Sequence, residues 1–332
     1  MSHYQHLTII ERESLWENKV KGKTLSEIAQ IIGRSVATVS RELKRNGNKH
    51  GYRPSEAQDK YRKRRRKCRR KLLLKEGPLK ETVSSLLSKQ QWSPEQISRR
   101  LEMECGPTVS YNTIYRAVKN GTMEEKGVKK NNQGRYPMSK YLRRKGWRSR
   151  KKSWNKTQDF IRQSIEERPK AAETRSQFGH WEGDLVYSSF HKVYIVTLVE
   201  RRSRYLLTGI SSSKKPKEIA EVFYKMLKDI PPKLVRTITL DRGKEFAEHS
   251  DVTSKLPHVQ FFFAHPASPW ERGLNENTNG LLRQYVPKHT YKVPFSHDLL
   301  LKFTDKLNRR PRKCLNWKSP FEFFFHKSLH LT

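Results

Sequence analysis

The apolar positions between residues 8 and 45 recur every three or four residues, a spacing that predicts three short amphipathic helices. Thr8, Thr24 and Ser35 stand at the expected starts, where a side-chain hydroxyl can accept a hydrogen bond from a free N–H of the first turn. Gly33 supplies the turn between the second and third helices. The predicted inner face comprises Leu25, Ile28, Ala29 and Ile32 in the second helix and Val36, Val39 and Leu43 in the third.

Two such helices joined by a tight turn form a helix-turn-helix unit, whose second helix enters the major groove of DNA. The basic outer face of the third helix favours this reading over the alternative, a purely structural three-helix bundle. The outward residues placed to contact bases and phosphates are Ser35, Ala37, Thr38, Ser40, Arg41, Lys44 and Arg45.

A weaker signal of the same kind lies between residues 92 and 121, where a longer connection separates two predicted helices. Ser93 followed by Pro94 predicts the start of one helix, and Ser110 predicts the start of the other. The residues predicted to face inward are Ile97, Leu101, Ile114, Tyr115 and Val118. Those predicted to face outward, towards DNA, are Tyr111, Asn112, Thr113, Arg116 and Lys119.

From Phe178 onward the pattern changes to runs of β-branched and aromatic residues, which are typical of strands. We expect strands at 181–187, 193–200, 205–210, 235–240 and 259–263, and helices at 216–228, from Glu245 and at about 273–285. Three strands followed by alternating helices and strands is the order of a ribonuclease-H-like α/β fold, in which an antiparallel meander precedes helical crossovers.

The charge balance bounds the class of partner. The 70 Lys and Arg residues against 33 Asp and Glu residues give a net charge of +37, which calls for a polyanion such as nucleic acid. Anionic membrane is the rival partner, but no run approaches the ~18 apolar residues of a spanning helix. The N-terminus lacks a signal-peptide pattern, so we expect a cytosolic, soluble protein. The three cysteines form no CxxC pair, which argues against a zinc site or a disulfide framework.

The segment 60–71 holds ten basic residues in twelve, and we interpret it as a DNA-tracking arm or, alternatively, a solvated linker. The predicted layout is therefore a helix-turn-helix domain over 1–58, a basic linker or arm over 59–78, a second helix-turn-helix-like domain over 79–122, a basic linker over 123–172, and a catalytic domain with a C-terminal helical extension over 173–332.

Two carboxylates occupy strands that the predicted topology makes neighbours. Asp184 lies inside the first strand, where apolar alternation does not explain it, and Asp241 directly follows the fourth. A third acid is expected from the last helix. Glu276 shares a helical face with Asn279 and Arg283 and is preferred to Glu271, which precedes the predicted helix.

Glu182 competes with this set, because it lies two residues before Asp184 and points to the same strand face. Three carboxylates brought together would repel one another unless a cation resolves the conflict. Mg²⁺ prefers such oxygen ligands, and two ions ~3.5 to 4 Å apart would serve an in-line phosphoryl transfer. We expect that Mn²⁺ substitutes.

With these residues identified, the chain resembles an insertion-sequence transposase of the IS-thirty family from about residue 4 to residue 325. The motifs that carry the resemblance are LSEIAQIIGRSVATVSREL, GHWEGDLV, VERRSRY, LDRGKEF, SPWERGLNENTNGLLRQYVPK and NRRPRKCLNWKSPFEFF. By this resemblance Asp184, Asp241 and Glu276 match the family's catalytic triad, and the protein acts in the bacterial cytosol.

The resemblance implies that the N-terminal helix-turn-helix recognises the terminal inverted repeats of a mobile element. One site then hydrolyses the element ends and joins the freed 3′ hydroxyls to double-stranded target DNA. Holding two ends together implies a homo-oligomeric synaptic complex. Arg283 is a candidate phosphate contact of the catalytic domain, with a solvated surface residue as the alternative. A non-catalytic regulator or decayed transposase is the alternative, against which the intact triad argues, and a simple nuclease of the same fold is a further one.

Overall fold

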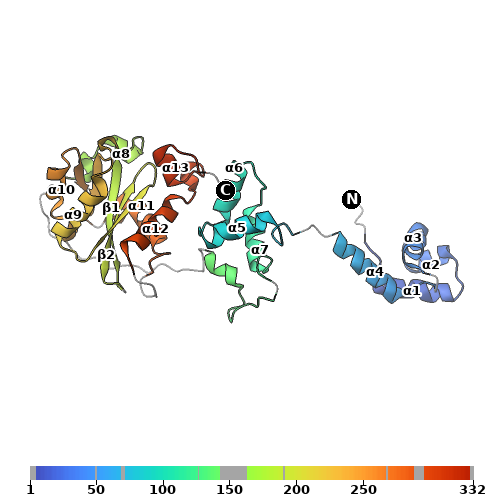
Figure 1. Ribbon diagram of the computed structural model, residues 1–332. Helices are drawn as coiled ribbons and strands as arrows, with labels where there is room; N and C mark the ends of the chain where they lie inside the picture. The colour runs from blue at the N-terminus through green and yellow to red at the C-terminus, as the bar shows by residue number, and fades with distance from the viewer. Residues whose placement is uncertain are drawn as a thin grey trace. The chain divides into compact units, whose positions relative to one another are not determined.

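The computed structural model describes residues 5–48, 51–68, 72–125, 127–142, 163–189, 191–266, 268–287 and 295–329. The chain divides into two compact units, Met1–Leu72 and Leu73–Thr332 (Figure 1). Unit 1 is entirely helical, and unit 2 joins a helical region to a mixed α/β domain. This is the predicted fold class, an all-α helix-turn-helix region followed by an α/β domain of ribonuclease-H-like topology.

Unit 1 consists of α1 (Ile9–Val20), α2 (Leu25–Ile31), α3 (Val36–Asn46) and α4 (Pro54–Lys67). The three predicted N-caps are confirmed, because Thr8, Thr24 and Ser35 each accept a hydrogen bond from the backbone N–H three residues later. The inner face is wrong at two positions, since Leu25 and Val36 are exposed. Each is the first helical residue, and its side chain points back past the helix start rather than onto the core.

Helix α4 begins inside the predicted first domain, 1–58. It continues to Lys67, through most of the basic segment 60–71 that the sequence suggested as an arm or linker. Ala57 is fully buried, and the Nη2 of Arg64 donates to the Oδ1 of Asn46 in α3 at 2.7 Å. One face of the helix therefore packs on unit 1, while long basic side chains cover the other. The prediction rested on charge density and overlooked this periodic face. The last basic residues, 69–71, lie outside the described part of the chain.

The helical region of unit 2 contains α5 (Pro78–Ser88), α6 (Pro94–Met103) and α7 (Tyr111–Lys119), with Ser93 and Ser110 as the predicted caps of the last two. Tyr115 was predicted to face inward but is exposed, because Ile114, Ala117 and Val118 form the buried face at a spacing of three and four residues.

The short 3₁₀ helix η1 (Pro137–Tyr141) packs against the same core through Met138 and Tyr141. It lies in the stretch 123–172 that was predicted to be a linker. The strongly basic residues 143–162 within that stretch lie outside the described part of the chain.

The sheet contains β1 (His180–Ser188), β2 (Val193–Glu200), β3 (Leu206–Ser211), β4 (Thr237–Leu240) and β5 (Gln260–Phe263) in the order β3-β2-β1-β4-β5. The first three strands are antiparallel, and β4 and β5 pair in parallel with β1 and with each other. The predicted meander and crossovers are confirmed, with each strand within two residues of its predicted bounds.

Two apolar cores lie on the two faces of this sheet. Helices α9 (Pro216–Leu227) and α10 (His249–Lys255) pack on one face around Trp181 and Ile238. Helices α11 (Gly273–Leu282) and α12 (His297–Asn308) pack on the other around Val186 and Ile195 (Figure 1). Alternate residues of β1 and β2 serve the two cores, as a strand with both faces covered requires.

Short elements complete unit 2. They are η2 (Ile165–Glu167), α8 (Lys170–Thr174), η3 (Pro232–Leu234), η4 (Lys244–Phe246), η5 (Pro269–Arg272), η6 (Lys313–Leu315) and α13 (Pro320–Phe325). Within the described ranges, the structure has no helix long and apolar enough to cross a membrane.

Candidate active site

Asp184 and Asp241 occupy equivalent places on two neighbouring parallel strands. Glu182 of β1 pairs with Thr239 of β4, and each aspartate lies two residues beyond its strand's member of that pair. Gly183 between Glu182 and Asp184 permits the close packing, since a Cβ there would lie 2.5 Å from the Cδ2 of Leu240. The predicted meeting of the two carboxylates at one edge of the sheet is thus explained by strand register.

A single arginine bridges the two aspartates. The Nη2 of Arg272 donates to the Oδ2 of Asp241 at 2.9 Å, and its Nη1 lies 3.6 Å from the Oδ1 of Asp184. The same Nη1 donates to the carbonyl oxygen of Gly183 at 3.1 Å. Arg272 is the last residue of η5 and precedes α11, so the start of this helix is tied to the ends of β1 and β4.

The second oxygen of each aspartate has a neutral donor. The Nδ2 of Asn279 in α11 donates to the Oδ2 of Asp184 at 2.7 Å, and the backbone N–H of Gly243 donates to the Oδ1 of Asp241 at 3.0 Å. Burial, which disfavours a charged carboxylate, raises the pKa of Asp184 to about 6; the charge of Arg272 opposes this rise and that of Asp241 adds to it.

Glu276 lies in the first turn of α11, exposed to solvent, on the helical face that also carries Asn279. Because Asn279 reaches Asp184, this face is the one directed at the aspartates, as the helical spacing predicted. The glutamate itself does not join them: among the described residues, no three His, Cys, Asp or Glu side chains are grouped as a metal site requires. One arginine charge offsets two carboxylates, and a third would add repulsion.

The two competing glutamates are committed elsewhere. Glu271 accepts from the backbone N–H and from the Nδ1 side of the ring of His265, at 2.9 and 2.8 Å. Glu182 is almost fully buried, forms an ion pair with Arg201 and accepts from the N–H of Asn275 at 3.3 Å. Glu182 therefore supports the first turn of α11 from beneath, which is a structural role.

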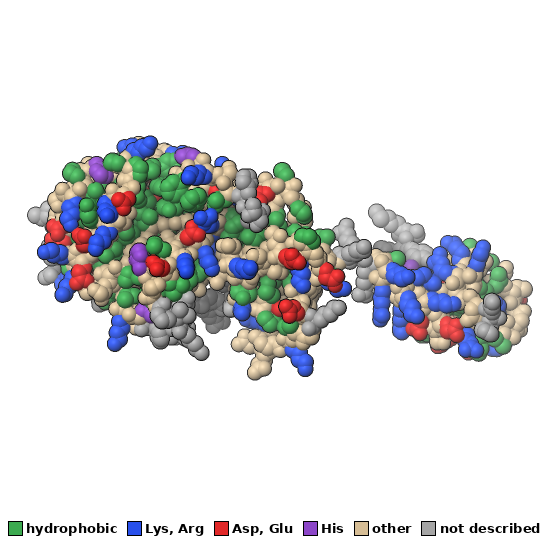
Figure 2. Space-filling view, viewed as in Figure 1, with side chains coloured by type: hydrophobic (Ala, Val, Ile, Leu, Met, Phe, Trp, Pro, Cys, Tyr) green, Lys and Arg blue, Asp and Glu red, His purple; other side chains and the backbone are tan. Residues whose placement is uncertain are grey.

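The predicted DNA-facing residues of the two helix-turn-helix regions are largely exposed. In α3 they are Ser35, Ser40, Arg41, Lys44 and Arg45, with Thr38 half-buried. In α7 they are Tyr111, Asn112, Arg116 and Lys119, with Thr113 half-buried. Lys and Arg side chains also crowd the face of unit 1 seen in Figure 2, and the last turn of α4 alone holds four basic residues. Arg283 differs, because its Nη2 donates to the carbonyl oxygen of Tyr187 at 2.8 Å.

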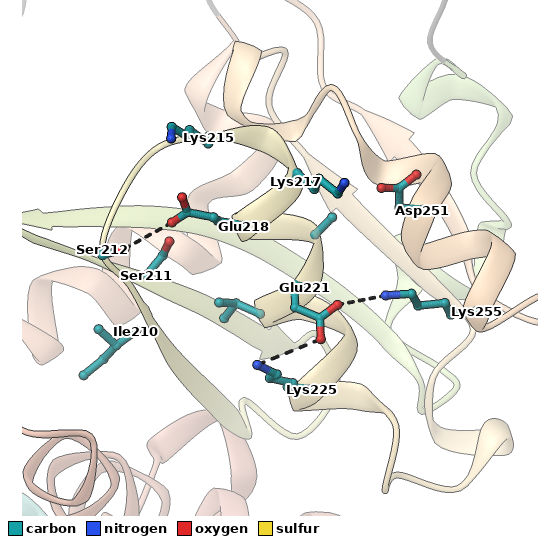
Figure 3. Close-up of a pocket in the computed structure, with 12 residues that line it drawn as sticks. Ile210, Ser211, Ser212, Lys215, Lys217, Glu218, Glu221, Lys225, Asp251 and Lys255 are labelled. Atoms are coloured by element: carbon teal, nitrogen blue, oxygen red, sulfur yellow. Dashed lines mark hydrogen bonds and ion pairs between the residues drawn. The ribbon is translucent and has the colours of Figure 1, made fainter.

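A depression of about 530 Å³ on the other face of the sheet contains neither aspartate. It is lined by the end of β3 and by α9 and α10, and its lysines are partly neutralised, since Glu221 pairs with both Lys225 and Lys255 (Figure 3). Nothing in this arrangement resembles the carboxylate pair, and we assign it no part in the chemistry.

Sequence reasoning missed Arg272 as a partner of the aspartates. The available signal was its spacing, four residues or about one helical turn before Glu276. The contact itself depends on the packing of α11 against β1 and β2, which no local pattern specifies.

Comparison with known proteins places these features in a family. Residues 3–46 match a family described as a helix-turn-helix domain. The chain is 33% identical over 326 residues to the transposase InsI of insertion sequence element IS30A from Escherichia coli (strain K12), covering 96% of this chain and 82% of that protein. It is 37% identical over 302 residues to the transposase of insertion sequence element IS4351 from Bacteroides fragilis, covering 90% and 88%.

Solved structures similar to this chain include the catalytic core domain of BIV integrase, with a TM-score of 0.37 at 17% identity over 44% of this chain and 93% of that one. The extent and identity of the matches to the transposases decide the family. This chain belongs to the IS-thirty (IS30) family of insertion-sequence transposases.

Proposed function

We propose that this protein binds the terminal inverted repeats of an insertion sequence, cleaves the element ends and joins the 3′ hydroxyls to target DNA. The observation that carries the proposal is that Arg272 bridges Asp184, inside β1, and Asp241, directly after the neighbouring β4, beneath the helical face that carries Glu276. Family membership supports the DNA substrate. The protein would act in the bacterial cytosol.

The donor set suits Mg²⁺. Asp184, Asp241 and Glu276 offer hard carboxylate oxygens, and the two aspartates already share one cationic partner in Arg272. These three residues would hold two Mg²⁺ ions, with Mn²⁺ as a substitute. When bound, the ions would activate the attacking hydroxyl and stabilise the leaving 3′ oxygen of an in-line phosphoryl transfer.

The chain's own residues would orient these ligands. Asn279 fixes one oxygen of Asp184, and the N–H of Gly243 fixes one oxygen of Asp241. A Cβ at Gly243 would lie 2.9 Å from the Oδ1 of Asp241, so only glycine gives the carboxylate this close backbone partner. The glutamate would come from α11, one turn before Asn279.

DNA recognition would begin with α3 of the first helix-turn-helix, through Ser35, Thr38, Ser40, Arg41, Lys44 and Arg45. The second helix-turn-helix would add Tyr111, Asn112, Thr113, Arg116 and Lys119, and Arg283 would contact phosphate beside the catalytic residues. Two element ends would be held in a homo-oligomeric complex.

The test incubates the purified full-length protein with Mg²⁺, labelled element ends and a target plasmid. Asp184→Asn, Asp241→Asn and Glu276→Gln should each abolish joining while end binding persists. Glu271→Gln is the matched control and should retain joining, because Glu271 is bound to His265. If joining survives in Glu276→Gln and is lost in Glu271→Gln, the third metal ligand is Glu271 and not Glu276.

Two other outcomes would replace the proposed function. Tight end binding by the wild-type protein without cleavage would identify a non-catalytic regulator or a decayed transposase. Cleavage of any duplex without joining would identify a nuclease.

A further inference from the structure

Arg272 contacts both aspartates through the oxygens that a metal ion would need. The Oδ2 of Asp184 accepts from Asn279 and the Oδ1 of Asp241 accepts from the N–H of Gly243, so the other oxygen of each carboxylate faces the guanidinium. A divalent ion bound by both aspartates uses these same oxygens. The ion and the guanidinium therefore exclude each other, both by space and by charge.

The arginine is held in a way that permits exchange. Its side chain is 14% exposed and that of Asp241 is 40% exposed, so one end of the bridge is open to solvent. The Arg201–Glu182 pair nearby is the contrast, because its side chains are 6% and 1% exposed and its carboxylate also receives a backbone N–H of α11. Arg201 is enclosed on both sides, whereas Arg272 meets solvent at Asp241, and its departure would break its hydrogen bonds to Asp241 and to the carbonyl oxygen of Gly183.

We propose that Arg272 is an exchangeable counter-ion of the aspartate pair, which compensates Asp184 and Asp241 until a divalent cation displaces it. Arg272 thereby sets the metal concentration at which the site fills. The proposal rests on the proposed function in taking the two aspartates as metal ligands. A planar guanidinium is suited to this task, since its fork reaches two carboxylates on different strands at once.

Exchange predicts that removal of the arginine charge strengthens metal binding. The experiment titrates Mn²⁺ into the full-length protein without DNA by isothermal titration calorimetry. The Kd for Mn²⁺ should fall about tenfold in Arg272→Gln, which corresponds to ~1.4 kcal/mol. Arg272→Lys keeps the charge but loses the two-pronged guanidinium, so its Kd for Mn²⁺ should lie between those of the wild type and Arg272→Gln. An Arg272→Gln Kd equal to or higher than wild type overturns the proposal and makes Arg272 a fixed clamp.

Arg242→Gln is the matched control. It removes the same charge one residue from Asp241, but the Nε of Arg242 donates to the carbonyl oxygen of Ala264 at 3.2 Å. Its Kd for Mn²⁺ should stay near the wild-type value. A tenfold fall here as well would mean that general charge, and not the bridge, controls affinity, and would overturn the proposal.

Thermal unfolding in EDTA gives a second readout, which does not depend on measuring a Kd for the metal. Arg272→Gln should lower the Tm, and saturating Mn²⁺ should restore more of it than in wild type. In an Asp184→Asn background the same change should lower the Tm less, because one carboxylate no longer needs compensation. Additive effects of the two changes would overturn the proposal.

The metal assignment can fail separately. If Asp184→Asn leaves the wild-type Mn²⁺ stoichiometry and Kd unchanged, the aspartates are not ligands. Both the proposed metal site and the displacement of Arg272 by a metal ion are then wrong. If Asp184→Asn weakens binding while Arg272→Gln does not strengthen it, the proposed function stands and only the exchange is wrong.

Discussion

Two helical regions of the chain, the helix-turn-helix domain of unit 1 and the region α5–α7 that we propose as a second one, each contain a helix that starts in the same way. Ser35 caps α3 and Ser110 caps α7, and in each case the serine hydroxyl lies 2.9 Å from that of a threonine three residues later. Six residues after each cap stands an exposed arginine whose Nε donates to the carbonyl oxygen four residues earlier. These are Arg41 and Arg116.

The two regions differ in how each compensates a buried arginine. Arg12 in unit 1 pairs with Glu42 at 2.7 Å and also donates to Gln58 and to the carbonyl oxygen of Leu7, all within unit 1. Arg100 in α6 pairs with Glu104 of its own helix and, through both Nη atoms, with Glu322 of α13 at 2.7 and 2.9 Å.

A buried arginine must be paired, so the position of its partner tells which segments have to fold together. Unit 1 supplies every partner of Arg12, whereas α6 depends on a glutamate 222 residues further along the chain. We call the contact between α6 and α13 through Arg100 and Glu322 the joint. Gln96, also in α6, strengthens it by donating to the carbonyl oxygen of Pro311 at 2.7 Å. The region α5–α7 is therefore held to the C-terminal helices of unit 2 by buried polar contacts.

The largest expected effect comes from breaking that joint. Glu322→Gln leaves Arg100 with Glu104 as its carboxylate partner and the carbonyl oxygen of Leu329 as a further acceptor, and both members of the broken pair are 6% exposed. We expect a loss of ~3 kcal/mol, since removal of one partner strands a buried charge. Hydrogen exchange followed by mass spectrometry should show lost protection in α6 and α13 and unchanged protection in α3.

Glu42→Gln is the counterpart in unit 1. It should deprotect α1 and α3 and leave α6 unchanged. The loss should be smaller, ~2 kcal/mol, because Glu42 accepts from the side chains of Arg12 and Tyr52, whereas Glu322 also accepts from two backbone N–H groups, those of Ser319 and Leu329. If either change removed protection in both unit 1 and α6, the conclusion that Arg12 and Arg100 are compensated within separate parts of the chain would be wrong.

Acid should release the same joint without any substitution. Burial alone would raise the pKa of Glu322, but hydrogen bonds from Arg100 and from the N–H groups of Ser319 and Leu329 lower it to about 2. The unfolded carboxyl titrates near 4.5, so the stabilisation is complete above pH 4.5 and is lost as the pH falls towards 2. The pH dependence of α6 protection should flatten over this window in Glu322→Gln. An unchanged profile in that variant would contradict the assignment to Glu322.

Arg41→Ala tests the first region as the reader of element ends. If Arg41 contacts a base edge, the loss should be ~2 kcal/mol for inverted-repeat DNA and much smaller for unrelated duplex. Fluorescence anisotropy at fixed salt measures both values. Equal losses on the two duplexes would assign Arg41 to phosphate contact instead.

Sequence reasoning succeeded wherever a local repeat decides the structure. The residue pattern located the strands of Asp184 and Asp241, and the predicted topology made these strands neighbours. The helical period placed Glu276 on the face of Asn279. It failed at α4, where a dense charge run concealed the buried face around Ala57. It also failed at Tyr115, where both an inward and an outward position fit the amphipathic pattern.

The contacts that define the site and the joint could not be predicted, for a common physical reason. Arg272 meets Asp184 and Asp241, and Arg100 meets Glu322, only after distant segments pack together. Each arginine is an ordinary surface-type residue in its local pattern. The partner that turns it into a buried counter-ion lies from 31 to 222 residues away.

Arg116→Ala should have the smallest effect and shows what the second region adds. Its position matches that of Arg41, but α7 exposes Tyr111, Tyr115 and one further cation, Lys119. By contrast, α3 exposes two further cations, Lys44 and Arg45. If Arg116 contacts phosphate, the substitution should weaken binding to every duplex by ~1 kcal/mol or less and reduce the salt slope by about 1. The measurement is the anisotropy titration repeated at several salt concentrations. A sequence-dependent loss as large as that of Arg41→Ala would mean that both regions read bases. The joint at Glu322 would then hold a second reading helix in register with the catalytic residues.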